Sequence, residues 1–155
     1  MPNEAEEKLA ELGLLLPPPA AAGAYAPAVR AGGLLFLSGT LPVRDGEPAF
    51  CGKVTPGADD IARAQEAARL CIANALANAR AELGSLDKVA RVVSLTGYVN
   101  GVDGFADAPK VINGASNLLL SVFGEAGRHS RAAVSVNGLP LNASVETSLV
   151  LEIAP

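Results

Sequence analysis

The residues best suited to chemistry are an arginine and a glutamate that begin two strand-like segments near the end of the chain. Residues 131–137 and 145–153 alternate in side-chain character, which is typical of strands whose successive side chains point to opposite faces of a sheet. Arg131 shares its face with Ser135, and the other face of that segment is apolar. A guanidinium fixed on a sheet can bind a carboxylate through two parallel hydrogen bonds. The pattern therefore predicts a small-anion site, with Glu146 on the next strand.

Two interpretations of Arg131 and Glu146 follow from the residues alone. They could form a cross-strand ion pair with a purely structural role, because buried arginines are usually paired. Alternatively, they could bind and act on a ligand. Residue types and spacing leave both interpretations open.

The composition indicates one compact domain that associates with copies of itself. The chain of 155 residues is close to the common domain size, and no shift in composition divides it. Hydrophobic residues make up 50% and charged residues 18%, which is apolar for a monomer and predicts a sizeable subunit interface. The 12 basic residues are scattered and are outnumbered by 16 acidic ones, so nucleic-acid binding is disfavoured.

The sequence predicts neither a metal site nor a membrane segment. Cys51 and Cys71 lie 20 residues apart without a CxxC motif, so we expect two buried, reduced thiols rather than a zinc or redox site. Residues 14–24 are apolar, but acidic residues precede them and three prolines interrupt them, which does not fit a secretory signal. No apolar run is long enough to span a membrane, and we expect a cytoplasmic protein.

Local signals divide the chain into an N-terminal arm and one domain. In the arm, residues 1–22, Asn3 is a suitable cap for a short helix that ends near Gly13. Pro17–Pro19 then force an extended segment. Residues 23–155 are predicted to form the single domain.

The domain is predicted to contain strands and two long helices in the order ββ-α-β-α-ββ. The predicted elements are a hairpin of 28–30 and 34–38, a turn at 44–47, a helix capped by Thr55 and stopped by Gly84, a strand at 89–99, and a helix from Asp107–Pro109 to Gly124 or Gly127, followed by the two segments above. This order predicts an α+β fold, a mixed β-sheet with two helices packed on one face. The other face must be covered, and self-association is the simplest way to cover it.

Residues 34–42, Leu-Leu-Phe-Leu-Ser-Gly-Thr-Leu-Pro, together with the 131–152 region, resemble the Rid family (YjgF/YER057c/UK114, also called endoribonuclease L-PSP). The resemblance covers most of residues 23–154. It implies a chorismate-mutase-like fold of the bacillus type, assembled as a homotrimer with inward-facing sheets and clefts between subunits. Catalytic members of the family hydrolyse reactive enamines and imines to a ketone or 2-oxo acid and ammonia. They use no metal and no organic cofactor.

The resemblance also assigns roles to individual residues. Arg131 matches the arginine that binds the substrate carboxylate, and Glu146 matches the acidic residue that positions water near the reacting carbon. Tyr25, Ser38 and Gly39 match residues that line the substrate cleft. From the residues alone, Tyr25 could equally be a packed aromatic. Ser38 and Gly39 could be no more than a strand end.

Other polar residues carry weaker signals. His129, the only histidine, is two residues before Arg131, and we expect a surface loop residue rather than an acid or base. No nucleophile–base spacing indicates a catalytic triad. Asn74 and Asn78 share a helix face, which favours a polar patch or a subunit contact over a catalytic pair.

Three functions of different classes fit this sequence. The first is cofactor-free hydrolysis of enamines or imines, with Arg131 as the carboxylate anchor and Glu146 handling water or protons. The second is a non-catalytic trimeric protein that binds a small carboxylate metabolite through Arg131. The third, an endoribonuclease, is the least favoured, because binding a phosphate backbone depends on accumulated positive charge.

Overall fold

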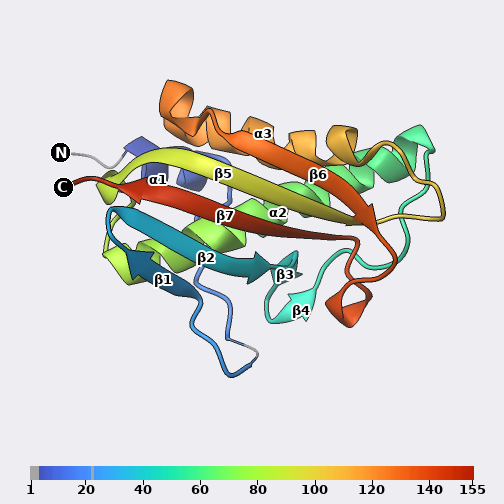
Figure 1. Cartoon of the computed structure of the whole chain (residues 1–155), viewed down its shortest axis with the longest axis horizontal. Coiled ribbons are helices and arrows are strands. Elements are labelled where there is room, and N and C mark those ends of the chain that lie inside the picture. Colours follow the sequence, from blue (N-terminus) through green and yellow to red (C-terminus); the bar gives the residue numbers. More distant parts are fainter. Residues whose placement is uncertain (1–3, 22) are drawn as a thin grey trace.

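A five-stranded mixed sheet, covered on one face by helices, forms the body of the protein (Figure 1). The computed structural model describes residues 4–21 and 23–155, so the cap expected at Asn3 lies outside the described residues. The elements are α1 (Glu4–Glu11), β1 (Ala28–Ala31), β2 (Leu34–Thr40), β3 (Val43–Arg44), β4 (Glu47–Pro48), α2 (Ala58–Leu83), β5 (Val89–Asn100), α3 (Ala108–Phe123), β6 (Ser130–Val136) and β7 (Val145–Ile153), with short 3-10 turns at Leu86–Lys88, Gly124–Gly127 and Pro140–Asn142.

The strand order in the sheet is β1-β2-β7-β5-β6, and β3 and β4 pair separately as a small hairpin. β5 and β6 run parallel, and the other neighbours are antiparallel. The crossover from β5 to β6 passes through α3, as a parallel pair requires. The α+β class and the mixed sheet are therefore confirmed, and β6 is an edge strand.

Two long helices, α2 and α3, pack on the same face of the sheet, as predicted. The alanine-rich side of α2 supplies Ala64, Ala68 and Ala75, all 0–1% exposed, and these small side chains let the helix lie close to the strands. A third, short helix, α1, joins this layer, with Leu9 at 1% exposure in the same core. The N-terminal arm thus contributes to the hydrophobic core of the domain.

The start of α2 differs from the sequence prediction. The cap is Gly57 and the first helical residue is Ala58, so the predicted Thr55 cap is wrong. Thr55 instead donates its backbone N–H to the carboxylate of Asp60 at 2.6 Å. This hydrogen bond is the largest of the influences that lower the pKa of Asp60. The predicted stop is confirmed, because Gly84 adopts a left-handed conformation with φ 84°.

The prediction that both cysteines are buried is half right. Cys71 is fully buried on α2, where desolvation raises the pKa of its thiol well above the ordinary value. Cys51 is exposed, because it lies beyond β4 in an isolated bridge to Ala143 rather than inside the core.

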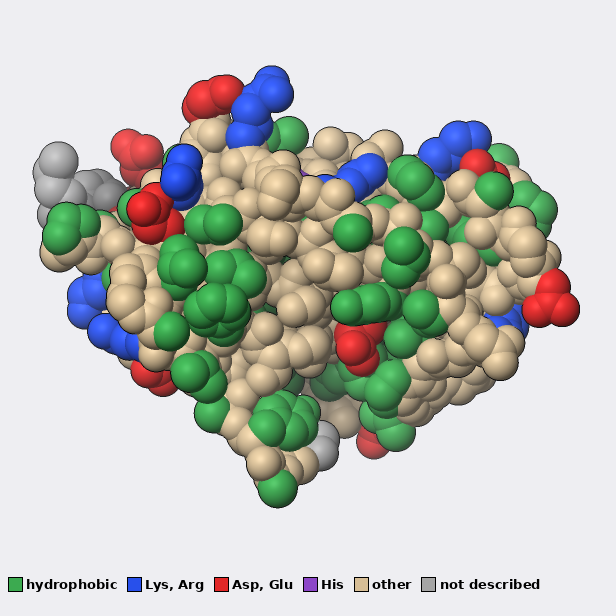
Figure 2. Space-filling view, in the orientation of Figure 1, with side chains coloured by type: hydrophobic (Ala, Val, Ile, Leu, Met, Phe, Trp, Pro, Cys, Tyr) green, Lys and Arg blue, Asp and Glu red, His purple; other side chains and the backbone are tan. Residues whose placement is uncertain are grey.

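The second face of the sheet has no helix over it. Figure 2 looks onto this open face and shows hydrophobic side chains spread across the strands. Val29, Phe36 and Val134 are 54%, 44% and 45% exposed, which is unusual for large apolar side chains on a sheet. No helix in the described part of the chain is long and apolar enough to cross a membrane.

Gly114 allows α2 and α3 to pack in close contact. A β-carbon at this position would lie 2.3 Å from the backbone oxygen of Gln65 on α2, so Gly114→Ala must push the helices apart. We expect a loss of about 1–3 kcal/mol in the free energy of unfolding, measured by urea denaturation. Gly138→Ala, where a β-carbon meets nothing within 4 Å, is the matched control. Equal stability of the two variants would contradict this packing argument.

Candidate active site

Arg131 projects from the edge strand β6 toward the helical side of the sheet. It pairs in register with Leu95, whose side chain is fully buried under the helices. Its guanidinium donates from Nη1 to the side-chain oxygen of Asn113 at 2.8 Å and to the hydroxyl of Ser116 at 3.1 Å. Nη2 donates to the backbone oxygen of Pro109 at 3.4 Å. All three acceptors belong to α3, so this helix fixes the orientation of the guanidinium.

His129 supports this arrangement from behind. Its Nδ1 is 2.6 Å from the backbone oxygen of Gly127, and its Nε2 is 2.9 Å from the hydroxyl of Ser116. A carbonyl oxygen only accepts, so Nδ1 carries the hydrogen, and in the neutral ring Nε2 accepts from Ser116. Ser116 in turn accepts from Arg131. His129 lies in the loop before β6, as expected, but it is partly buried and bonded at both nitrogens rather than free on the surface.

One edge of the Arg131 guanidinium keeps its donors available. Three of its five hydrogens are used on α3, and Nε has no acceptor within the described residues. Nε and the second hydrogen of Nη2 form the side-on fork that matches the two oxygens of a carboxylate. Because the side chain is exposed, an anion can reach this edge.

Glu146 lies on the opposite face of the sheet. In β7 the side chains of Val145 and Thr147 are buried under the helices, and Glu146 between them points to the open face, in register with Tyr98. Its carboxyl is about half-buried, and this desolvation raises the pKa of Glu146 above its ordinary value. A carboxyl with a raised pKa is better suited to taking up and returning a proton near neutral pH.

Gly39 leaves the space that the Glu146 carboxyl occupies. A β-carbon at Gly39 would be 2.7 Å from Oε2 of Glu146, so a side chain there would displace the carboxylate. The β2–β7 register shifts by one residue between Leu37 and Thr40, which places Ser38 and Gly39 in a β-bulge. Bulges of this kind are frequent beside active sites, where they redirect side chains.

Ser38 holds the segment that carries Tyr25. Its hydroxyl donates to the backbone oxygen of Ala26 at 2.6 Å, and its backbone N–H donates to that of Pro27 at 2.9 Å. Tyr25 is 54% exposed, so it is not a packed core aromatic.

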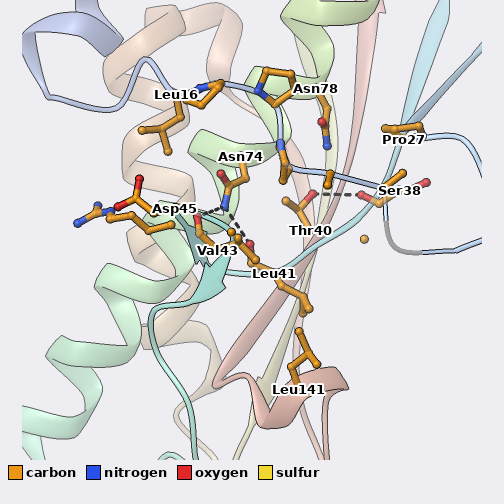
Figure 3. A pocket seen from close by; sticks show the side chains of 18 of the residues that line it. Leu16, Pro27, Ser38, Thr40, Leu41, Val43, Asp45, Asn74, Asn78 and Leu141 are labelled. Atoms are coloured by element: carbon orange, nitrogen blue, oxygen red, sulfur yellow. Dashed lines mark hydrogen bonds between the residues drawn. The ribbon is translucent and has the colours of Figure 1, made fainter.

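A pocket of about 430 Å³ opens next to the bulge (Figure 3). Tyr25, Ser38 and Gly39 are among its lining residues, and Glu146 adjoins it through Gly39. Four of the five predicted site residues are therefore neighbours. Arg131 is the exception, because it lies on β6, at the edge of the sheet far from β2, and on the opposite face from Glu146.

Within one chain, Arg131 and Glu146 do not form an ion pair. Their side chains leave the sheet on opposite faces, and the ion pairs among the described residues include neither of them. The structural cross-strand bridge is thus wrong as an interpretation of this chain.

Asn113 and Ser116 were missed by the sequence reasoning. The available signal was their spacing of three residues, which places both on one face of the helix. Across residues 4–21 and 23–155, no group of three or more His, Cys, Asp and Glu side chains is arranged to hold a metal ion.

A family model described as "YjgF/chorismate mutase-like, putative endoribonuclease" matches residues 6–153. The chain belongs to this family. Protein TCP17 of Trypanosoma cruzi is 43% identical over 148 residues, which cover 94% of this chain and 91% of TCP17.

Solved structures of relatives agree with this assignment. The protein Atu1372 from Agrobacterium tumefaciens, whose function is described as unknown, is 47% identical and superposes with a TM-score of 0.89, covering 98% of this chain and 94% of that one. E. coli TdcF with bound serine is 22% identical with a TM-score of 0.63, covering 87% of this chain and 92% of its own, and shares the fold.

Replacing Glu146 by glutamine tests the burial of its charge. Because the pKa is raised in the folded chain, the folded state binds the proton more readily than the unfolded state. Protonated Glu146 therefore contributes to the free energy of unfolding. This contribution is fully present below the ordinary glutamate pKa of about 4.3, and it is lost as the pH rises through the higher pKa of the folded state. Glu146→Gln should therefore melt higher than wild type at pH 7, with a difference that shrinks toward pH 4.

Glu152→Gln is the control, since Glu152 is on the same face of β7 but its side chain is 41% exposed and pairs with Arg91 at 2.7 Å. A Glu146→Gln protein that melts lower than wild type at pH 7 would contradict the account.

Proposed function

We propose that this protein hydrolyses reactive enamines and 2-imino acids, without a cofactor, at clefts formed between its subunits. The observation that carries the proposal is the division of the site. Arg131 offers a free guanidinium edge on one face of the sheet, and Glu146 carries a raised pKa on the other face. The two can act on one small molecule only when they come from different subunits.

The open face supplies the surface for such an assembly. Large apolar side chains remain exposed across it, including Val29, Phe36 and Val134. Burying them against copies of the same chain would remove this apolar area from water. We propose a homotrimer in which the open faces point inward and the edge strand β6 of each subunit approaches the β2 bulge of a neighbour.

In this cleft, Arg131 of the partner subunit binds the substrate carboxylate through its free Nε/Nη2 edge. The carboxylate then fixes the imine carbon relative to Glu146 and the backbone at Gly39. A water molecule held by Glu146 adds to the carbon of the protonated imine and gives one proton to the Glu146 carboxylate, which forms a neutral carbinolamine. Glu146 returns this proton to the nitrogen and then takes the proton of the carbinolamine hydroxyl as the C–N bond breaks and the C=O bond forms. The released ammonia accepts that proton from Glu146 and leaves as ammonium together with the 2-oxo acid.

The surroundings of Glu146 support both proton steps. Desolvation makes its carboxylate a stronger base than an exposed one, so it can take a proton from water and hand it to the leaving nitrogen. The bulge at Ser38 and Gly39 keeps the space beside the carboxyl open. Tyr25, which precedes the Ala26 backbone that Ser38 binds, forms one side of the cleft.

The relatives support a small-molecule ligand. TdcF, which shares the fold, is described with bound serine, a small amino acid with a carboxylate. An endoribonuclease, the activity named in the family description, is disfavoured for this chain because it has a net charge of −4 and scattered cations. We also propose a cytoplasmic location and a single domain over residues 23–155, preceded by an arm of residues 1–22.

Turnover by variants separates hydrolysis from mere binding. With freshly generated 2-iminopropanoate, Arg131→Ala should lower kcat/KM by about 100-fold or more, because a charged anchor is lost. Glu146→Gln should lower kcat by about 100-fold or more while a 2-oxo acid still binds. Arg128→Ala and Glu152→Gln are the controls, since both residues form exposed ion pairs elsewhere. If the wild-type protein binds the 2-oxo acid but turns over no imine, the non-catalytic carboxylate-binding function is favoured instead.

Ser116→Ala tests whether α3 orients the anchor. It removes one of the three hydrogen bonds to Arg131 and leaves the guanidinium free to turn, so we expect KM to rise about 5- to 10-fold with a smaller change in kcat. Ser121→Ala, an exposed serine on the same helix, should leave both constants as in the wild type. Equal KM values for the two variants would remove Ser116 from the site.

A further inference from the structure

The pocket beside the β2 bulge extends well beyond the residues that the reaction uses. It begins at Ser38 and Gly39 and continues under the proline-rich segment of the arm to the β3–β4 hairpin (Figure 3). Its volume of about 430 Å³ lies within the range of roughly 300–1,000 Å³ typical of ligand pockets, and far exceeds what a methyl side chain requires. The apolar part of its lining includes Leu16, the three prolines of residues 17–19, Ala20 and Ala21.

The arm forms a preorganised wall of this pocket. On one side of residues 16–21, α1 is fixed by the buried Leu9 and by an ion pair of 2.7 Å between Glu6 and Arg80. On the other side, Ser38 binds the backbone of Ala26. Proline restricts the backbone between these two anchors. The wall therefore needs little ordering when a ligand enters.

The polar residues of the pocket favour an uncharged group inside it. Asn74 is 2% exposed and its amide donates to the backbone oxygens of Leu41 and Val43, so it is already satisfied. Arg44 and Asp45 both line the hairpin end, and together they carry no net charge. A second charge on the ligand would meet one attractive and one repulsive neighbour, whereas an aliphatic group gains from the surrounding apolar side chains.

We propose that this pocket binds the side chain of the substrate, and that the preferred substrates are 2-imino acids with a bulky aliphatic side chain. The inference rests on the proposed function, which places the imine carbon beside Gly39 at the mouth of the pocket. The substrate carboxylate then points toward Arg131 of the partner subunit, and the side chain points under the arm. Leu16 and the prolines act as specificity-determining residues, because they set the depth of the pocket.

The test compares the imines derived from leucine and alanine, generated in place from the amino acids. We expect kcat/KM to be about tenfold or more higher for 2-imino-4-methylpentanoate than for 2-iminopropanoate, given the extra methylenes buried. Ala20→Trp and Ala21→Trp fill the pocket from two exposed lining positions and should each remove most of this preference. Ala10→Trp, an exposed position on α1 outside the pocket, should keep it.

A binding measurement separates failure of the pocket from failure of the proposed hydrolysis. Calorimetry with the stable products, 4-methyl-2-oxopentanoate and pyruvate, should show the same preference and its loss in both tryptophan variants. If this preference holds but no imine is turned over, the side-chain pocket stands and the hydrolysis fails. If imines are hydrolysed with no side-chain preference, or if the tryptophan variants keep it, the pocket proposal is overturned. If the tryptophan variants change only the mass of the assembly and leave ligand binding as in the wild type, a neighbouring subunit fills the pocket. That result would also overturn the pocket proposal.

Discussion

The alternation of side chains along β6 and β7 is the constraint on which the proposed site depends. It directs Arg131 toward the helices and Glu146 toward the open face, so that one sheet separates the two groups within a chain. A change of side-chain rotamer cannot bring the two groups to the same face, and a backbone shift could do so only by breaking the register of the sheet. The proposed chemistry therefore requires a second copy of the chain, and the apolar open face provides the surface for it.

The same helix that buries the sheet also orients the anchor. Gly97 and Gly114 let α3 approach β5 and α2 closely, since a β-carbon at either would lie within 2.5 Å of Ile112 or of the Gln65 backbone. The close approach of α3 to the sheet sets the position of Asn113 and Ser116 beside Arg131. Packing in the core and the direction of the guanidinium are thus coupled, which explains how an exposed arginine is held by three hydrogen bonds.

The sequence was sufficient for features that depend on local periodicity. Alternation placed Arg131 and Glu146 on strands, and Gly84 marked the end of α2. Features that depend on tertiary contacts were not accessible in this way. The exposure of Cys51 and the Arg131–Ser116–His129 chain of hydrogen bonds depend on contacts between separate elements, whose proximity no local pattern records. The arm was predicted as a short helix followed by an extended proline segment, but its place beside the pocket depends on the packing of α1.

The most direct test of a shared cleft is complementation between two inactive variants. Arg131→Ala and Glu146→Gln chains, co-expressed in equal amounts with different tags, form mixed assemblies that are purified through both tags. If each site takes Arg131 from one subunit and Glu146 from another, every mixed trimer has both groups restored in one of its three clefts, and imine hydrolysis returns to about a third of the wild-type rate. Mixed assemblies no more active than either parent would contradict a site built across the subunit boundary.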